Sequence, residues 1–199
     1  MQNLPDATSW AEDAAHEMRR TAEAIAAAPI PHHLGEERLN FAKLGEGTQA
    51  VIDRLAPKDR IDRDRSLYII GLDDQADPEE ILRTYAEAKR RGDLKLPQNN
   101  SVTSNVLYVG SSCATAKRTN TLRSRLSQHL ISAPRGTYAL SMAKWASHLS
   151  GGLIVNTWQY PPAGEGLDGD KAARLIVLSV EEWLANKLKP MLGRRGLRH

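Results

Sequence analysis

The chain has a single cysteine, Cys113, among its 199 residues. A lone cysteine excludes an intramolecular disulfide and fits a reducing compartment such as the cytoplasm. Aromatic residues make up only 5% of the chain, so the core must be mostly aliphatic. No apolar run approaches the roughly 18 residues that a membrane span needs, and the acidic start of the chain lacks an apolar signal core. We therefore expect a cytoplasmic protein without a membrane partner.

Acidic residues are missing from a long central run. Residues 94–164 contain no Asp and no Glu, whereas about eight or nine would be expected at the frequency of acids in the whole chain. Neutralising phosphates and releasing their counterions supplies most of the sequence-independent affinity for nucleic acid. The run therefore indicates a phosphate-facing surface, with chance patterning as the alternative. Its basic side chains are Lys95, Lys117, Arg118, Arg123, Arg125, Arg135 and Lys144.

Charge divides the chain into an acidic front and a basic back. The formal net charge is +3 overall. Residues 1–65 carry −3 and residues 66–199 carry +6. The front contains two Ala- and Leu-rich segments that end at prolines, which predict helices over 8–28 and 35–55. We interpret residues 1–65 as a helical N-terminal region that serves as an accessory or partner surface.

The C-terminal part of the chain, residues 66–199, alternates short β-branched runs with helical patterns. This order predicts an α/β domain of the α+β type, with a small three-stranded sheet flanked by helices, over residues 66–193. A basic tail, 194–199, follows it. The predicted strands are 66–72, 106–110 and 152–160, and the predicted helices are 77–91, 119–132, 138–149 and 169–189.

Two polar residues share one face of the helix predicted at 119–132. Arg125 and His129 are four residues apart, so they are neighbours on the helix surface. A guanidinium can hold two phosphate oxygens, and an imidazole can orient a water molecule or pass a proton. Arg123 is six residues from His129 and falls on another face. An isolated pair of this kind is more often a solvated helix face, so it needs further support.

Tyrosines and a carboxylate supply that support. Tyr68 and Tyr108 lie in the first two predicted strands, and Gly110 lets the backbone approach closely after Tyr108. A strand tyrosine is usually a packing residue. Glu181 and Glu182 interrupt the apolar pattern of the last helix, and a carboxylate there can bind a hard divalent cation.

Four segments, taken in order, resemble the GIY-YIG endonuclease superfamily: SLY (66–68), YVG (108–110), LRSRLSQHL (122–130) and EEWLANKLKPMLG (181–193). The resemblance covers roughly two thirds of the chain and implies hydrolysis of nucleic acid with one divalent metal, Mg²⁺ or Mn²⁺. It implies that one cleft holds the catalytic residues Tyr68, Tyr108, Arg125, His129 and Glu181. Glu181, nine residues before Pro190, is then the metal ligand, with Glu182 as second choice. The nucleic-acid contacts would be Lys117, Arg118, Arg123, Arg135 and Lys144.

The chain departs from the family pattern in two places. The family's two tyrosines are usually about ten residues apart, whereas residues 73–104 separate Tyr68 from Tyr108 here as an insertion that could contact DNA. The family often has Asn shortly after the proline, where this chain has Gly193. Asn186 or Asn156 could substitute for that amide. The long insertion and the extra N-terminal region are reminiscent of restriction-type members.

The sequence therefore predicts a metal-dependent endonuclease that hydrolyses DNA, duplex or branched. One alternative is a nucleic-acid-binding module of the same fold that has lost catalysis. Another is a protein-interaction role centred on residues 1–56. The sequence leaves open the choice between DNA and RNA, the target, and whether two copies dimerise to make the two incisions that a duplex requires.

Overall fold

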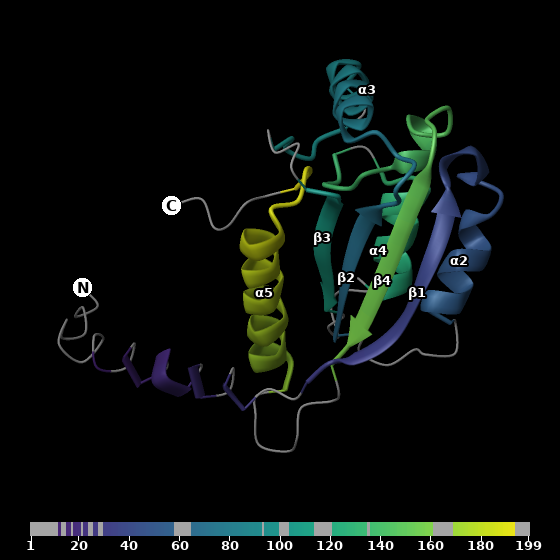
Figure 1. The fold of residues 1–199 in the computed structure, drawn as a ribbon. Helices are drawn as coiled ribbons and strands as arrows, with labels where there is room; N and C mark the ends of the chain where they lie inside the picture. Colours follow the sequence, from purple (N-terminus) through teal and green to yellow (C-terminus); the bar gives the residue numbers. More distant parts are fainter. Residues whose placement is uncertain are drawn as a thin grey trace.

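A computed structural model describes residues 30–57, 65–92, 94–99, 104–113, 121–134, 136–160 and 169–193, and isolated positions between 12 and 27. The described residues form one antiparallel sheet of four strands in the order β1-β4-β2-β3 (Figure 1). The three-stranded sheet predicted from the sequence is therefore wrong by one strand. The strands are β1 (His32–Asn40), β2 (Arg65–Leu72), β3 (Val106–Cys113) and β4 (Gly152–Gln159).

The additional strand, β1, lies where the sequence predicts the first half of a helix over 35–55. Its residues pair with β4 from His32 opposite Gln159 to Asn40 opposite Gly152. This pairing supplies the backbone hydrogen bonds that a helix would otherwise make, and tertiary context outweighs helix propensity. The helical prediction holds only for α2 (Thr48–Leu55), after the 3₁₀ turn η1 (Phe41–Lys43). Residues 32–55 thus belong to the sheet and its core.

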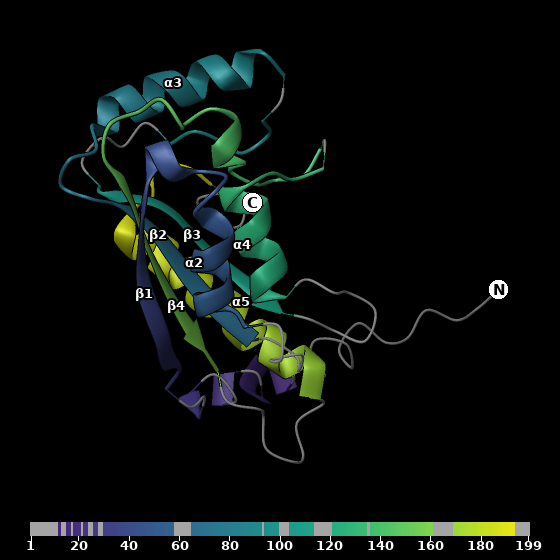
Figure 2. The ribbon, with the colours of Figure 1, turned by 90° about the vertical axis from the view of Figure 1, so that its right-hand side faces the viewer.

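Helices cover both faces of the sheet. Helices α2 and α4 (Leu122–Leu130) lie on one face, and α5 (Gly169–Leu188) lies on the other, against β2 and β3 (Figure 2). Because side chains alternate along a strand, Tyr68 of β2 joins the larger core under α2 and α4, whereas Leu67 joins the smaller core under α5.

Helix α3 (Pro78–Arg90) crosses one end of the sheet (Figure 1). The Asp77 carboxylate caps it by accepting a hydrogen bond of 2.9 Å from the Glu79 backbone N–H. Gly92 ends it in the left-handed region, with φ +89°. Both ends agree with the sequence prediction.

The helix predicted over 138–149 is wrong. Only the 3₁₀ turn η2 (Met142–Lys144) forms there, after Ser141, whose φ is +48°. The apolar spacing that suggested a helix comes from an irregular segment folded against the core, where the Trp145 indole N–H donates to the Leu140 carbonyl at 2.8 Å. Within the described part of the chain, no helix has the length and apolarity needed to cross a membrane.

Candidate active site

The two strand tyrosines and the helix histidine form one aromatic cluster. Tyr68 lies opposite Gly110 in the β2–β3 pairing and Tyr108 opposite Ile70, so both tyrosines face α4. The His129 ring centroid lies 4.4 Å from that of Tyr108 and 5.5 Å from that of Tyr68. Tyr68 and His129 are completely buried, and Tyr108 keeps 7% of its surface exposed. The pairing of two neighbouring strands thus brings together tyrosines that are 40 positions apart in the sequence.

Gly110 makes room for this cluster. A Cβ atom built there would overlap the hydroxyl of Tyr68 and the ring of Tyr108. A methyl group at this position would therefore displace the tyrosines from each other. The glycine is required for space, since its φ is not among the positive values found at other glycines of the described chain.

The hydrogen bonds of His129 fix its tautomer. The Leu140 backbone N–H donates to Nδ1 at 3.2 Å, so Nδ1 carries no proton. Burial, followed by the nearby charge of Arg125, holds the pKa of His129 well below 6.5. The ring is therefore neutral with its proton on Nε2, which lies 3.1 Å from the Tyr68 hydroxyl. His129 donates to the Tyr68 oxygen, and the hydroxyl proton of Tyr68 stays available for another acceptor.

Arg125 and Glu181 reach the cluster from opposite faces of the sheet. Arg125 lies on α4, where its guanidinium donates to the Gln128 side-chain oxygen at 2.8 Å. Glu181 lies on α5 and accepts a hydrogen bond from the hydroxyl of Ser111 in β3. Burial raises the pKa of Glu181, while the Ser111 bond and the Arg125 charge partly oppose that rise. The Arg125 guanidinium and the Glu181 carboxylate therefore approach the edge strand β3 from its two sides.

Both tyrosines are weak acids in this environment. Burial raises the pKa of Tyr108 to about 12 and that of Tyr68 well above 10. The positive charge of Arg125 and its polar contact with both hydroxyls act in the opposite direction, whereas Glu181 adds to the rise. Either phenol therefore needs added positive charge nearby before it can give up its proton.

The oxygen donors present suit a magnesium ion that keeps most of its water. No three His, Cys, Asp or Glu side chains gather into a metal-binding group among the described residues. Mg²⁺ is commonly bound through one or two carboxylates, with waters and substrate phosphates completing its shell. Glu181 is half-buried and directed at Ser111, so this single carboxylate fits such an ion. The set does not fit zinc, which prefers several nitrogen or sulfur ligands.

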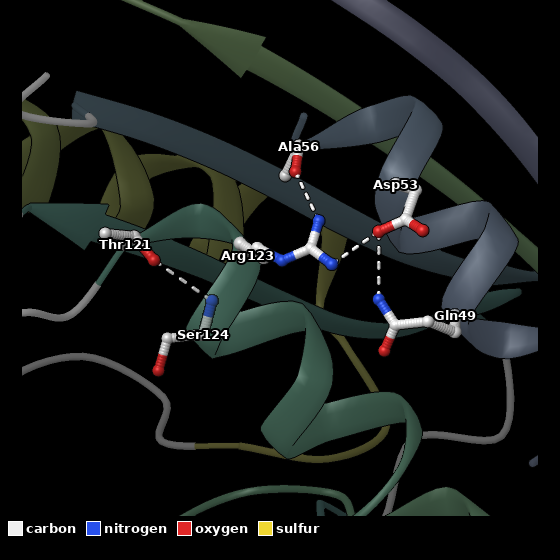
Figure 3. A network of polar contacts seen from close by, with 6 residues as sticks. All are labelled: Gln49, Asp53, Ala56, Thr121, Arg123 and Ser124. Carbon is white, nitrogen blue, oxygen red and sulfur yellow. Dashed lines mark hydrogen bonds and ion pairs between the residues drawn. The ribbon is translucent and has the colours of Figure 1, made fainter. Parts of the chain in front are cut away.

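The structure gives Arg123 a structural partner. Its guanidinium donates to the Asp53 carboxylate on α2 and to the Ala56 carbonyl at 2.9 Å, linking α4 to α2 (Figure 3). Thr121 caps the same helix by accepting from the Ser124 N–H at 3.1 Å (Figure 3). Lys144 is exposed in η2. Contacts of Arg123 and Lys144 with nucleic acid stay predictions, and Lys117, Arg118 and Arg135 lie outside the described residues.

Two residues of this region have no counterpart in the sequence prediction. Ser111 belongs to an extension of β3 beyond residue 110, and the alternation of the strand directs it towards α5. Asn99, in the insertion, donates to the Gly193 carbonyl at 3.2 Å. The amide near Gly193 thus comes from Asn99. Asn156 instead bonds Glu36 and His33 of β1, and Asn186 is exposed on α5.

Comparisons of the chain with protein-family models, with curated proteins and with solved structures found no match. The chain's own motifs and the arrangement of its side chains are therefore the basis for assigning a function.

Proposed function

We propose that the protein is an endonuclease that hydrolyses phosphodiester bonds in DNA, with Mg²⁺ or Mn²⁺ as cofactor. One observation carries the proposal: two phenols, a neutral imidazole, a guanidinium and a carboxylate from β2, β3, α4 and α5 converge around one edge of the sheet. Hydrolysis of a phosphodiester needs a proton acceptor, a positive charge for the phosphoryl oxygens and a hard cation site. The resemblance to the GIY-YIG superfamily supports the same assignment.

Arg125 and Glu181 bind the phosphate and the metal. The Arg125 guanidinium, fixed by Gln128, holds a non-bridging oxygen and stabilises the charge that grows there in the transition state. Glu181, oriented by Ser111, would hold the metal through its carboxylate. When bound, the metal would supply Lewis-acid stabilisation of the leaving oxygen.

Tyr68 is the proposed general base. Its proton is not used in the bond with His129, because the Nε2–H of His129 is the donor. That bond would persist in the phenolate and favours the charged form. The Arg125 charge acts in the same direction on its pKa. Once a bound metal ion supplies further positive charge, the Tyr68 hydroxyl would release its own proton to solvent, and the resulting phenolate would accept a proton from the attacking water.

A plasmid-nicking assay in Mg²⁺ tests the proposal. We expect Glu181→Gln and Arg125→Ala each to slow cleavage by about 100-fold or more, the scale seen when a charge-stabilising group is removed. Tyr68→Phe should be slower than Tyr108→Phe if Tyr68 is the base. Glu182→Gln should retain cleavage, which separates Glu181 from the second-choice ligand, and Arg54→Ala, an exposed arginine on α2, is the control for the loss of a guanidinium. Equal cleavage rates for wild type and Glu181→Gln would show the assignment to be wrong.

The second candidate is a nucleic-acid-binding module that does not cut. Gly193, where the GIY-YIG superfamily often has Asn, favours it, and so do the raised pKa values of both tyrosines. Metal-independent DNA binding without nicking in Mg²⁺ or Mn²⁺ would select this candidate.

A further inference from the structure

The segment that follows α5 is held between two other parts of the chain. On one side it bonds β3, with the Met191 N–H donating to the Val106 carbonyl at 2.9 Å and the Leu192 N–H to the Leu107 carbonyl at 3.0 Å. On the other side Leu192 forms a β-bridge with Gln98 of the insertion. The insertion therefore contacts the segment after α5, and that segment is in turn hydrogen-bonded to the edge strand β3.

Asn99 makes most of the polar contacts on the insertion side. Its side-chain amide donates to the carbonyls of Pro190 at 2.9 Å and Gly193 at 3.2 Å. Its backbone N–H donates to the Met191 carbonyl at 2.8 Å. The Gly193 N–H in turn donates to the Pro97 carbonyl at 2.9 Å. Both amide protons are used, and an Asp in this position would retain the shape of the side chain without either donor.

These bonds hold Gly193 against the ring of a proposed site residue. Gly193 has φ +115°, and a Cβ atom there would lie 3.2 Å from Cε2 of Tyr108. The same ring contacts His129. The Tyr108 ring thus packs against His129 and lies next to Gly193, the residue that Asn99 holds. Movement of Gly193 would change the surroundings of that ring directly.

The insertion also holds the end of the helix that carries Glu181. The Ser104 hydroxyl donates to the Leu188 carbonyl at 2.9 Å. Lys189 follows in the left-handed region, with φ +49°. Glu181 lies about two helical turns before this point. Two residues of the insertion, Asn99 and Ser104, therefore contact the segments that support the Tyr108 phenol and the Glu181 carboxylate.

We propose that residues 94–99 and Ser104 of the insertion act as a clamp that sets the active geometry, with Asn99 as its positioning residue. Asn99 acts through Gly193 on the ring of Tyr108, and Ser104 acts through the end of α5 on Glu181. The proposal rests on the proposed function for its effect on cleavage, but its structural part can be measured independently. In this proposal the insertion helps to set the geometry of the site, and contact with DNA is not its only role.

The test compares Asn99→Asp, Asn99→Ser and the control Asn186→Asp, which makes the same chemical change at an exposed position. The protein is labelled with 3-fluorotyrosine, and Tyr108→Phe assigns one of its five tyrosine signals. We expect Asn99→Asp to shift the Tyr108 signal and leave that of Tyr160 unchanged. In the nicking assay kcat should fall at least tenfold while KM stays within about twofold. Asn99→Ser, which keeps one donor, should lie in between.

The outcomes separate this proposal from the proposed function. A shifted Tyr108 signal in a protein that never cuts DNA supports the clamp and contradicts the nuclease. Normal cleavage with an unchanged Tyr108 signal in Asn99→Asp overturns the clamp and leaves the nuclease intact. Loss of every native tyrosine signal in both Asn99 variants also overturns it, because Asn99 would then serve general stability alone.

Discussion

The Glu181 carboxylate lies in a buried environment that disfavours its charged form. Burial raises its pKa above the usual 4.5, so in the folded protein it holds its proton to higher pH than in the unfolded chain. Stability is therefore lost as pH rises from about 4.5 through the folded pKa, and the loss is complete above it. Side chains kept under such a cost are typical of functional sites.

Glu181→Gln should remove that cost. We expect the variant to melt at a higher temperature than wild type at pH 7–8, with the difference vanishing near pH 4, where both side chains are neutral. Ser111 can still donate to the amide oxygen. Mg²⁺ should raise the melting temperature of wild type and leave that of the variant unchanged. Thermal melts across pH, with Glu182→Gln as control, measure both effects. A variant less stable than wild type at pH 8 would contradict this reading.

His129 presents the opposite case among the site residues. Its pKa is lowered well below 6.5, so the unfolded chain takes up a proton first as pH falls. The stability contributed by the neutral ring is present above pH 6.5 and is lost below it. His129 therefore donates one fixed hydrogen bond to Tyr68 across neutral pH, and its titration does not set the pH dependence of cleavage there.

Among the secondary-structure elements, β3 depends on one glycine for the geometry of the site. We expect Gly110→Ala to lower stability by about 1–3 kcal/mol, the usual cost of overpacking a core, and to abolish cleavage, because the new methyl group meets both tyrosines. Gly71→Ala is the matched control on β2, where the nearest atom to an added Cβ lies 3.4 Å away. Urea denaturation and the nicking assay measure the pair. Equal stability of the two variants would count against the packing argument.

Elements with strong local signals were predictable, and those set by distant pairing were not. Strand β2 and helix α3 follow from a β-branched run and from the Asp77-Pro78 start with its Gly92 stop. Strand β1 exists because β4 pairs with it, and no local pattern in 32–40 reports that partner. Asn99 was missed for the same reason, since its partners lie some ninety positions away in the sequence. The candidate site residues were found because their motifs resemble, in order, those of the GIY-YIG superfamily.

At the scale of the whole molecule, the N-terminal part consists of residues that precede the sheet, 1–29, and residues that include β1 and α2. Deleting residues 1–29 stops before the sheet begins, and we expect that variant to melt cooperatively near the wild-type temperature. Deleting residues 1–57 removes β1 and α2, with the buried side chains of Phe41, Ile52 and Leu55, and should leave no cooperative transition. Circular dichroism melts measure both. A cooperative transition for the longer deletion would restore the view that this region is an accessory.

The strand order has a consequence for the order of synthesis. Strand β4 lies between β1 and β2 in the sheet but follows both in the chain. While β4 is not yet made, β1 has no neighbour and β2 can pair only with β3, which leaves strand edges open for a long stretch of translation. The β2–β3 pair brings the two tyrosines together early. Glu181 follows β4 in the chain, so during synthesis the proposed metal ligand is added only after all four strands of the sheet have been made.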